Sequence, residues 1–122
     1  VASLAEFYSE IHQRYAKAFH HGVFFFGHIG DGNLHIFIQG PKSSAIDSAA
    51  RTKFLANAKA VDLELFEILR GFKGSVSAEH GIGLLKRHAL HFTRSHQEIE
   101  LMRGLKRVFD PMGLLNPGKL LN

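Results

Sequence analysis

Apolar residues recur at helical spacing in three stretches of the chain. The first stretch predicts a helix over residues 2–20, whose start Ser3 can cap. The second predicts a helix over residues 45–70, closed by Gly71. The third predicts a helix that begins near Ser95, with Glu98 at capping-box spacing, and stops before Pro111. The apolar stripe of the second helix is Phe54, Ala58, Val61, Leu65 and Ile68.

Between the first two helices the pattern changes to two apolar runs that flank a turn of Gly, Asp and Asn. This composition predicts a β-hairpin over residues 23–39. With a turn centred on residues 31–32, His28 and His35 stand directly opposite each other on one face, their Cβ atoms about 5 Å apart. A three-residue turn would break this pairing. Because both faces are largely apolar, we expect the hairpin to be central and covered on both sides.

Two imidazoles at this spacing allow two interpretations. Both rings can reach one metal ion or one substrate. Alternatively, they are core histidines whose hydrogen bonds are satisfied, because an unpaired buried polar group costs about 1–3 kcal/mol. The pattern alone leaves both interpretations open.

A second candidate site lies in residues 74–83, which we expect to be extended and to turn into a glycine-rich loop before a short helix over residues 84–92. Neighbouring side chains of an extended segment point to opposite sides, so Glu79 and His80 would have different tasks. One could complete a metal set with His28 and His35, and the other could act as acid or base. Alternatively, Glu79 caps the following helix and His80 lies in a surface loop.

The amino-acid composition restricts the kinds of site that the chain can form. The chain has 122 residues, which is one domain's worth, and no cysteine, which excludes disulfides, thiolate metal sites and a cysteine nucleophile. A metal site must therefore use His, Asp or Glu, which suits zinc or another divalent ion. The net charge of +4 comes from scattered Lys and Arg, so we expect no nucleic-acid partner, whereas an anionic small molecule fits. We expect no transmembrane segment and a cytoplasmic location, with any membrane association arising through partners.

These elements predict an α+β fold with one antiparallel hairpin packed with amphipathic helices. A sheet of two or three strands is thin for a domain with two faces to cover. The chain also starts at Val1 rather than Met. We therefore interpret residues 1–122 as one portion of a larger fold.

Three motifs occur in order: residues 28–35, residues 77–83 and residues 110–119. Together they resemble the C-terminal part of the FAD-linked oxidases of the vanillyl-alcohol oxidase type. The most similar members are D-lactate dehydrogenases, the glycolate oxidase FAD subunit and D-2-hydroxyglutarate dehydrogenases. The resemblance covers residues 27–119, which is most of the chain.

The resemblance implies a partial ferredoxin-like substrate domain laid over a flavin that a separate N-terminal domain binds. It implies oxidation of a D-2-hydroxy acid, of the lactate, glycolate or 2-hydroxyglutarate class, to the 2-oxo acid, with hydride transfer to FAD. The positions of His28, His35 and Glu79 correspond to ligands of a divalent ion, commonly zinc. His80 corresponds to the base that takes the hydroxyl proton, and Asn116 lies close to the flavin, so both are assigned to cofactor binding.

The family's FAD-binding domain has no counterpart in these residues, so we expect this fragment to be inactive alone. Its expected partners are the small 2-hydroxy acid, the missing FAD-binding domain, an electron-acceptor protein and a second copy in a homo-oligomer. Two alternatives remain at this point. One is a metal-binding or metal-hydrolase domain that works by itself with the same ligands, and the other is a basic interaction domain without chemistry.

Overall fold

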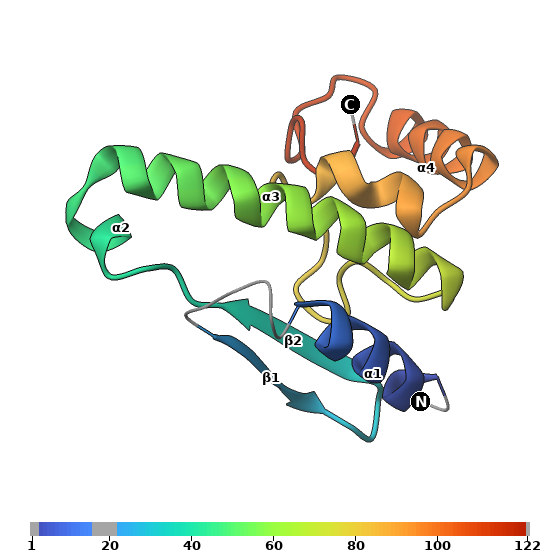
Figure 1. Cartoon of the computed structure of the whole chain (residues 1–122). Helices are drawn as coiled ribbons and strands as arrows, with labels where there is room; N and C mark the ends of the chain where they lie inside the picture. The colour runs from blue at the N-terminus through green and yellow to red at the C-terminus, as the bar shows by residue number, and fades with distance from the viewer. Residues whose placement is uncertain (1–2, 16–21, 122) are drawn as a thin grey trace. The chain divides into compact units, whose positions relative to one another are not determined.

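The computed structural model describes residues 3–15 and 22–121. The chain divides into two compact units, Val1–Ile68 and Leu69–Asn122. One antiparallel hairpin and several helices make the fold, which confirms the predicted α+β class (Figure 1). In chain order the elements are α1 (Leu4–Tyr15), β1 (Val23–His28), β2 (Asn33–Ile38), α2 (Ser43–Ile46), α3 (Ser48–Gly71), the 3₁₀ helix η1 (Arg87–Phe92) and α4 (His96–Phe109).

The hairpin forms as predicted, but its register differs by two residues. His28 pairs with Asn33, and His35 pairs with Phe26. The turn therefore comprises residues 29–32, and the prediction that His28 stands directly opposite His35 is wrong. The turn is centred on residues 30–31, one position earlier than predicted, and this centre also consists of turn-forming glycine and aspartate, so turn composition alone did not fix the register. A shift of two keeps every side chain on its predicted face, and both histidines still share one face.

Among the described residues, only one face of the hairpin is covered, so the prediction of a central hairpin is wrong. On the covered face, Phe25 meets Tyr8 of α1 edge to face, with ring centroids 5.1 Å apart. On the histidine face, three phenylalanines are more than half exposed. His28 itself is exposed and His35 is half-buried, so neither is a core histidine. The exposed phenylalanines are Phe24, Phe26 and Phe37.

The first helix, α1, packs through one apolar face. Phe7 and Ile11 are buried, and Tyr15 donates a hydrogen bond from its hydroxyl to Glu64 of α3 at 2.7 Å. The structure describes the predicted helix from Leu4 to Tyr15, and residues 16–21 of that prediction lie outside the described residues.

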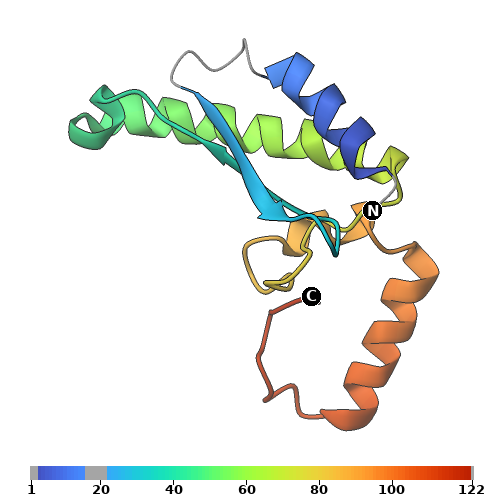
Figure 2. The same cartoon turned by 90° about the horizontal axis from the view of Figure 1, so that it is seen from below.

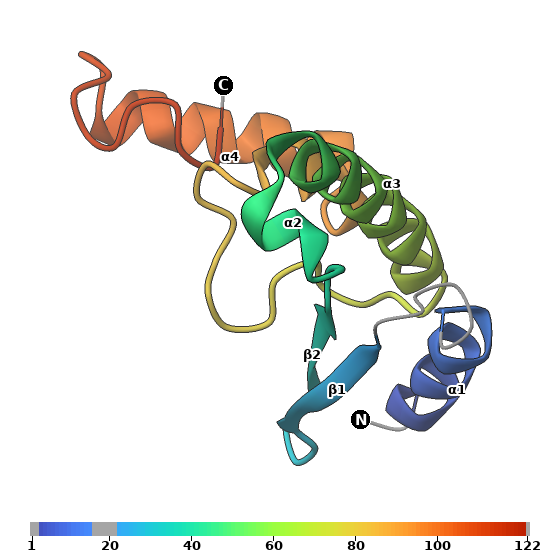
Figure 3. The ribbon, with the colours of Figure 1, turned by 60° about the vertical axis from the view of Figure 1, so that its left-hand side comes forward.

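The predicted helix over residues 45–70 is two helices. The chain leaves helical geometry at Asp47, where φ is −110° and ψ is 120°. The Asp47 carboxylate then accepts a hydrogen bond from the Ala49 N–H at 2.9 Å, which favours a new start over a continuous helix. Figure 3 shows the short α2 separated from the long α3 by this break. The predicted apolar stripe of α3 is confirmed, because all five of its residues are buried or half-buried and it includes the buried Leu65.

Residues 74–86 have no strand, so the predicted extended segment is wrong. Bends and turns replace it, stabilised by side chains rather than by a partner strand. The Val76 N–H donates to Thr93 Oγ1 at 3.0 Å, and Lys86 Nζ donates to the Val76 carbonyl at 2.7 Å. The short helix that follows is 3₁₀ and begins at Arg87 rather than at residue 84.

The last helix, α4, begins as predicted. Ser95 is the N-cap, and it forms a complete capping box with Glu98. Two apolar residues of α4, Leu105 and Val108, are exposed. Figure 2 shows the chain leaving the end of α4 and turning back as an irregular tail.

Within the described residues, no helix has both the length and the apolar character needed to cross a membrane.

Candidate functional site

Two imidazoles lie at diagonal positions on the open face of the hairpin. The ring centroids of His28 and His35 are 6.3 Å apart, and the ring planes are inclined by 65°. His28 comes from the end of β1 and His35 from the middle of β2. Rigid strands therefore present both rings toward one region above the sheet.

The turn holds this geometry through a close backbone approach. A Cβ atom at Gly27 would lie 2.1 Å from the Asn33 carbonyl oxygen, so the strands meet here only because residue 27 has no side chain. Asp31 Oδ1 accepts a hydrogen bond from the Asn33 N–H at 3.4 Å, and Gly32 has a φ of 74°. The predicted role of Asp31 in turn formation is confirmed, and the turn fixes the position of His28.

A phenylalanine orients the second imidazole. The Phe26 ring stacks on His35 with centroids 5.0 Å apart and planes within 11° of parallel. Stacking restricts rotation of the His35 ring and leaves its nitrogens at the ring edge, where they can bind a ligand.

Glu79 and His80 point toward each other, not to opposite sides as predicted. Glu79 Oε1 lies 3.2 Å from His80 Nε2, and both side chains are largely exposed. The bent backbone brings them together, because Ser77 Oγ donates to the Gly81 carbonyl at 2.7 Å and closes a tight loop. A carboxylate beside an imidazole orients the ring, which suits a group that takes a proton.

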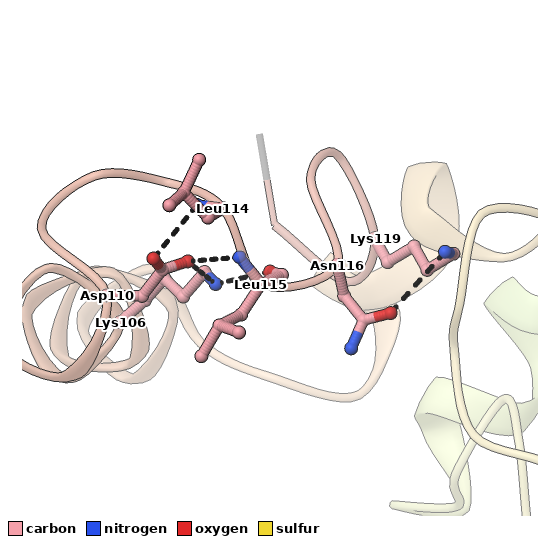
Figure 4. Close-up of polar contacts among 6 residues, drawn as sticks. All are labelled: Lys106, Asp110, Leu114, Leu115, Asn116 and Lys119. Carbon is pink, nitrogen blue, oxygen red and sulfur yellow. Dashed lines mark hydrogen bonds and ion pairs between the residues drawn. The ribbon is translucent and has the colours of Figure 1, made fainter.

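The irregular tail is organised around one buried carboxylate (Figure 4). Asp110 accepts hydrogen bonds from the Leu114 and Leu115 N–H groups, each at 2.9 Å, and from Lys106 Nζ. Lys106 Nζ also donates to the Leu115 carbonyl at 2.6 Å. The hydrogen bond from Lys106 is the main cause that lowers the pKa of Asp110, so this group is a carboxylate at neutral pH.

Asn116 follows directly after these contacts, and its φ is 47°. Its Oδ1 faces Lys119 Nζ at 3.5 Å. Further along, Arg87 donates to the Gly118 carbonyl at 2.6 Å, and the Leu120 N–H donates to the Gly83 carbonyl at 2.9 Å. Within the second unit, the tail with Asn116 is therefore attached to the loop that follows Glu79 and His80.

Sequence reasoning gave Lys106 and Asp110 no role. Their i, i+4 spacing at the end of a predicted helix was an available signal, because such pairs lie on one helix face. Gly113, which has a φ of 65°, marks the sharp turn that lets the chain return to the carboxylate. The hydrogen bonds to Leu114 and Leu115 depend on tertiary geometry that no sequence period encodes.

The side chains of the three candidate metal ligands have donor atoms that suit a divalent ion. His28 and His35 supply two imidazoles from the first unit, and Glu79 supplies a carboxylate in the second. Nitrogen and oxygen donors in this combination suit zinc, which three protein ligands can hold with one position open.

Residues 1–120 match the family described as FAD linked oxidases, C-terminal domain, and the chain belongs to this family. Among its relatives is the D-2-hydroxyglutarate dehydrogenase of Xanthomonas citri pv. viticola, which is 49% identical over 98% of this chain and 24% of the relative. The D-2-hydroxyglutarate dehydrogenase of Stutzerimonas stutzeri is 45% identical over 80% of this chain and 20% of the relative. The mitochondrial D-2-hydroxyglutarate dehydrogenase of Danio rerio is 40% identical over 79% of this chain and 16% of the relative. The chain thus spans a quarter or less of the length of these relatives.

Proposed function

We propose that this chain is the substrate- and metal-binding part of a flavin-dependent dehydrogenase that oxidises a D-2-hydroxy acid to the 2-oxo acid. One observation carries the proposal: two imidazoles share the open face of a hairpin in a chain that belongs to the FAD-linked oxidase C-terminal family. The names of the relatives support a 2-hydroxy acid as the substrate class.

Each candidate residue has a role in this proposal. His28, His35 and Glu79 bind a divalent ion, with zinc as the expected one. Such an ion supplies a Lewis acid that lowers the pKa of the substrate hydroxyl. His80 takes the hydroxyl proton, and the neighbouring Glu79 carboxylate orients its ring. Asn116 would contact the flavin when it is bound.

The reaction balances as a two-electron oxidation. The substrate loses the proton of its hydroxyl group to His80 and the hydride of its C2–H bond, and the C2–O bond becomes a carbonyl. FAD, bound by the separate domain, would supply the hydride acceptor, and an acceptor protein would then reoxidise it. The FAD-binding domain, the electron acceptor, a homo-oligomer and the cytoplasmic location stay predictions.

Zinc titration of the purified chain tests the metal site. We expect His28→Ala and His35→Ala each to weaken zinc binding by at least about 100-fold, because loss of an outer hydrogen-bond partner already costs about 10–100-fold. Glu79→Gln should weaken it in the same direction. His96→Ala is the matched control, because His96 is an exposed histidine at the start of α4. Equal zinc affinity in the control and in both hairpin variants would contradict the metal site.

Flavin bleaching tests the reaction. In the FAD-loaded enzyme that contains this chain, D-lactate, glycolate and D-2-hydroxyglutarate are added in turn without an electron acceptor. We expect at least one of them to abolish the absorbance of oxidised flavin. His80→Asn should slow this bleaching by about 100-fold, the middle of the range for loss of a general base. An enzyme whose flavin stays oxidised with all three acids would disprove the proposed function.

A further inference from the structure

Two side chains at the end of α4 bind the backbone of Leu115, the residue before Asn116, one at its N–H and one at its carbonyl. Asp110 accepts a hydrogen bond from the Leu115 N–H, and Lys106 donates one to the Leu115 carbonyl. Both peptide groups that flank Leu115 are thereby fixed, so the direction in which the chain enters Asn116 is set by two side chains of one helix turn. Figure 4 shows this arrangement, in which the ion pair lies between α4 and the tail.

Beyond Asn116 the tail is fixed again. The Lys119 N–H donates to the Asn116 carbonyl at 3.2 Å, and Arg87 binds the Gly118 carbonyl. Asn116 is therefore the left-handed residue between two fixed points, and its φ of 47° is a conformation that asparagine tolerates better than most residues. Figure 4 shows its amide nitrogen turned away from Lys119, where it can donate to a bound group.

We propose that Asp110 and Lys106 are positioning residues that fix Asn116 for its contact with the flavin. This inference rests on the proposed function, in which Asn116 lies beside FAD. In this proposal Asp110 and Lys106 do not contact the substrate or the flavin themselves. They act through the peptide groups of Leu115, and the burial of Asp110 makes this contact stronger than a surface pair would be.

The substitution Asp110→Asn keeps the size of the side chain and removes its charge. It therefore tests whether Asp110 and Lys106 fix the peptide groups of Leu115. An asparagine has one acceptor oxygen and one NH₂ group, so one of the two backbone N–H groups then faces a donor, and the attraction for Lys106 is lost. In the 122-residue chain we expect the Leu115 amide hydrogen to exchange about 10-fold faster, because its acceptor is weakened. Glu98→Gln is the matched control, because it exchanges a carboxylate for an amide at the other end of the same helix.

The absorption spectrum of the flavin then reports whether Asp110 and Lys106 act through Asn116. In the FAD-loaded enzyme we expect Asn116→Ala and Asp110→Asn to shift the absorption spectrum of the flavin in the same direction. We expect Asp110→Asn to lower kcat by about 10- to 100-fold at nearly unchanged KM, as misplacement of a positioned group does. In the Asn116→Ala background, Asp110→Asn should add no further change, because the two residues act as one unit.

Two results would overturn the inference. The first is an unchanged flavin spectrum in Asp110→Asn or in Asn116→Ala. The second is an effect of Asp110→Asn that persists at full size in the Asn116→Ala background. If the wild-type flavin still bleaches with a 2-hydroxy acid, either result disproves the positioning role and leaves the proposed function intact. A wild-type flavin that does not bleach disproves both.

Discussion

At position 27 the hairpin leaves no room for a side chain, and this single constraint shapes the candidate metal site. The backbone of Asn33 occupies the place of a Cβ atom, whereas a Cβ atom at Gly30 in the turn would meet nothing within 4 Å. Two glycines three residues apart therefore have different tasks. Gly27 permits the close approach that positions His28, and Gly30 only completes the turn.

We expect Gly27→Ala to destabilise the chain by about 1–3 kcal/mol, because the Asn33 carbonyl must move to admit the methyl group. Gly30→Ala should change the unfolding free energy by less than about 0.5 kcal/mol. Urea unfolding of both variants checks this difference. A Gly27→Ala chain as stable as Gly30→Ala would show that the strands tolerate a wider separation.

Individual residues show which features of the candidate site could be predicted from the sequence. The shared face of His28 and His35 was predictable, because the side-chain period of a strand is two and a register shift of two preserves it. Their direct pairing was not, because several placements of a four-residue turn fit the same glycine-rich segment. The contact between Glu79 and His80 depends on bends that Ser77 and Gly81 form, and no hydrophobic period predicts them.

Among the elements, α1 and α3 are joined by one hydrogen bond with a measurable pH dependence. Burial, followed by the hydrogen bond to Glu64, raises the pKa of Tyr15 from 10.0 to about 12. The folded state therefore binds the phenolic proton more tightly than the unfolded state. Its contribution to stability is complete below pH 10 and is lost as the pH rises from 10 toward 12.

Tyrosinate absorbance checks this directly, because the chain has two tyrosines and no tryptophan. In a Tyr8→Phe chain, we expect Tyr15 to titrate with a midpoint near 12, with folding monitored by circular dichroism. Adding Glu64→Gln should move the midpoint only part of the way back toward 10, because burial is the larger cause. A folded Tyr8→Phe chain that titrates near 10 would contradict the buried hydrogen bond.

Helices with a clear hydrophobic period or a capping motif were predictable from the sequence, and segments without either were not. The stripe of α3 and the capping box of α4 follow from spacing alone. The break at Asp47 was missed because helix periodicity continues across it, while the Asp47 side chain competes for the N–H of Ala49. The 3₁₀ form of η1 and the irregular residues before it are set by contacts such as Val76 with Thr93.

For the whole molecule, the proposed metal ligands come from distant parts of the sequence. His28 and His35 belong to the hairpin, and Glu79 belongs to the loop before η1. An ion that binds only the folded chain would stabilise the fold. The family itself was predictable from three ordered motifs, and the match over residues 1–120 confirms that prediction.

We expect zinc at about 100 times its dissociation constant to raise the unfolding free energy by about 2.7 kcal/mol. Glu79→Gln should remove most of this increase, although the residue lies in the other unit from the histidines. Thermal unfolding with and without zinc measures this increase in the unfolding free energy. His96→Ala, in the same unit as Glu79, is the control. An unchanged increase in Glu79→Gln would show that the first unit binds the ion without the carboxylate.

The hairpin has a final consequence for the behaviour of the chain in solution. Within residues 3–15 and 22–121, the sheet has only two strands, so each strand keeps one outer row of backbone N–H and C=O groups unpaired by any other strand. The mean hydropathy of −0.04 would predict ordinary solubility. Yet such rows, beside the exposed rings of Phe24, Phe26 and Phe37, are a template for strand addition between molecules. We therefore expect the sheet edges, rather than the overall composition, to set the concentration at which copies of this chain begin to associate.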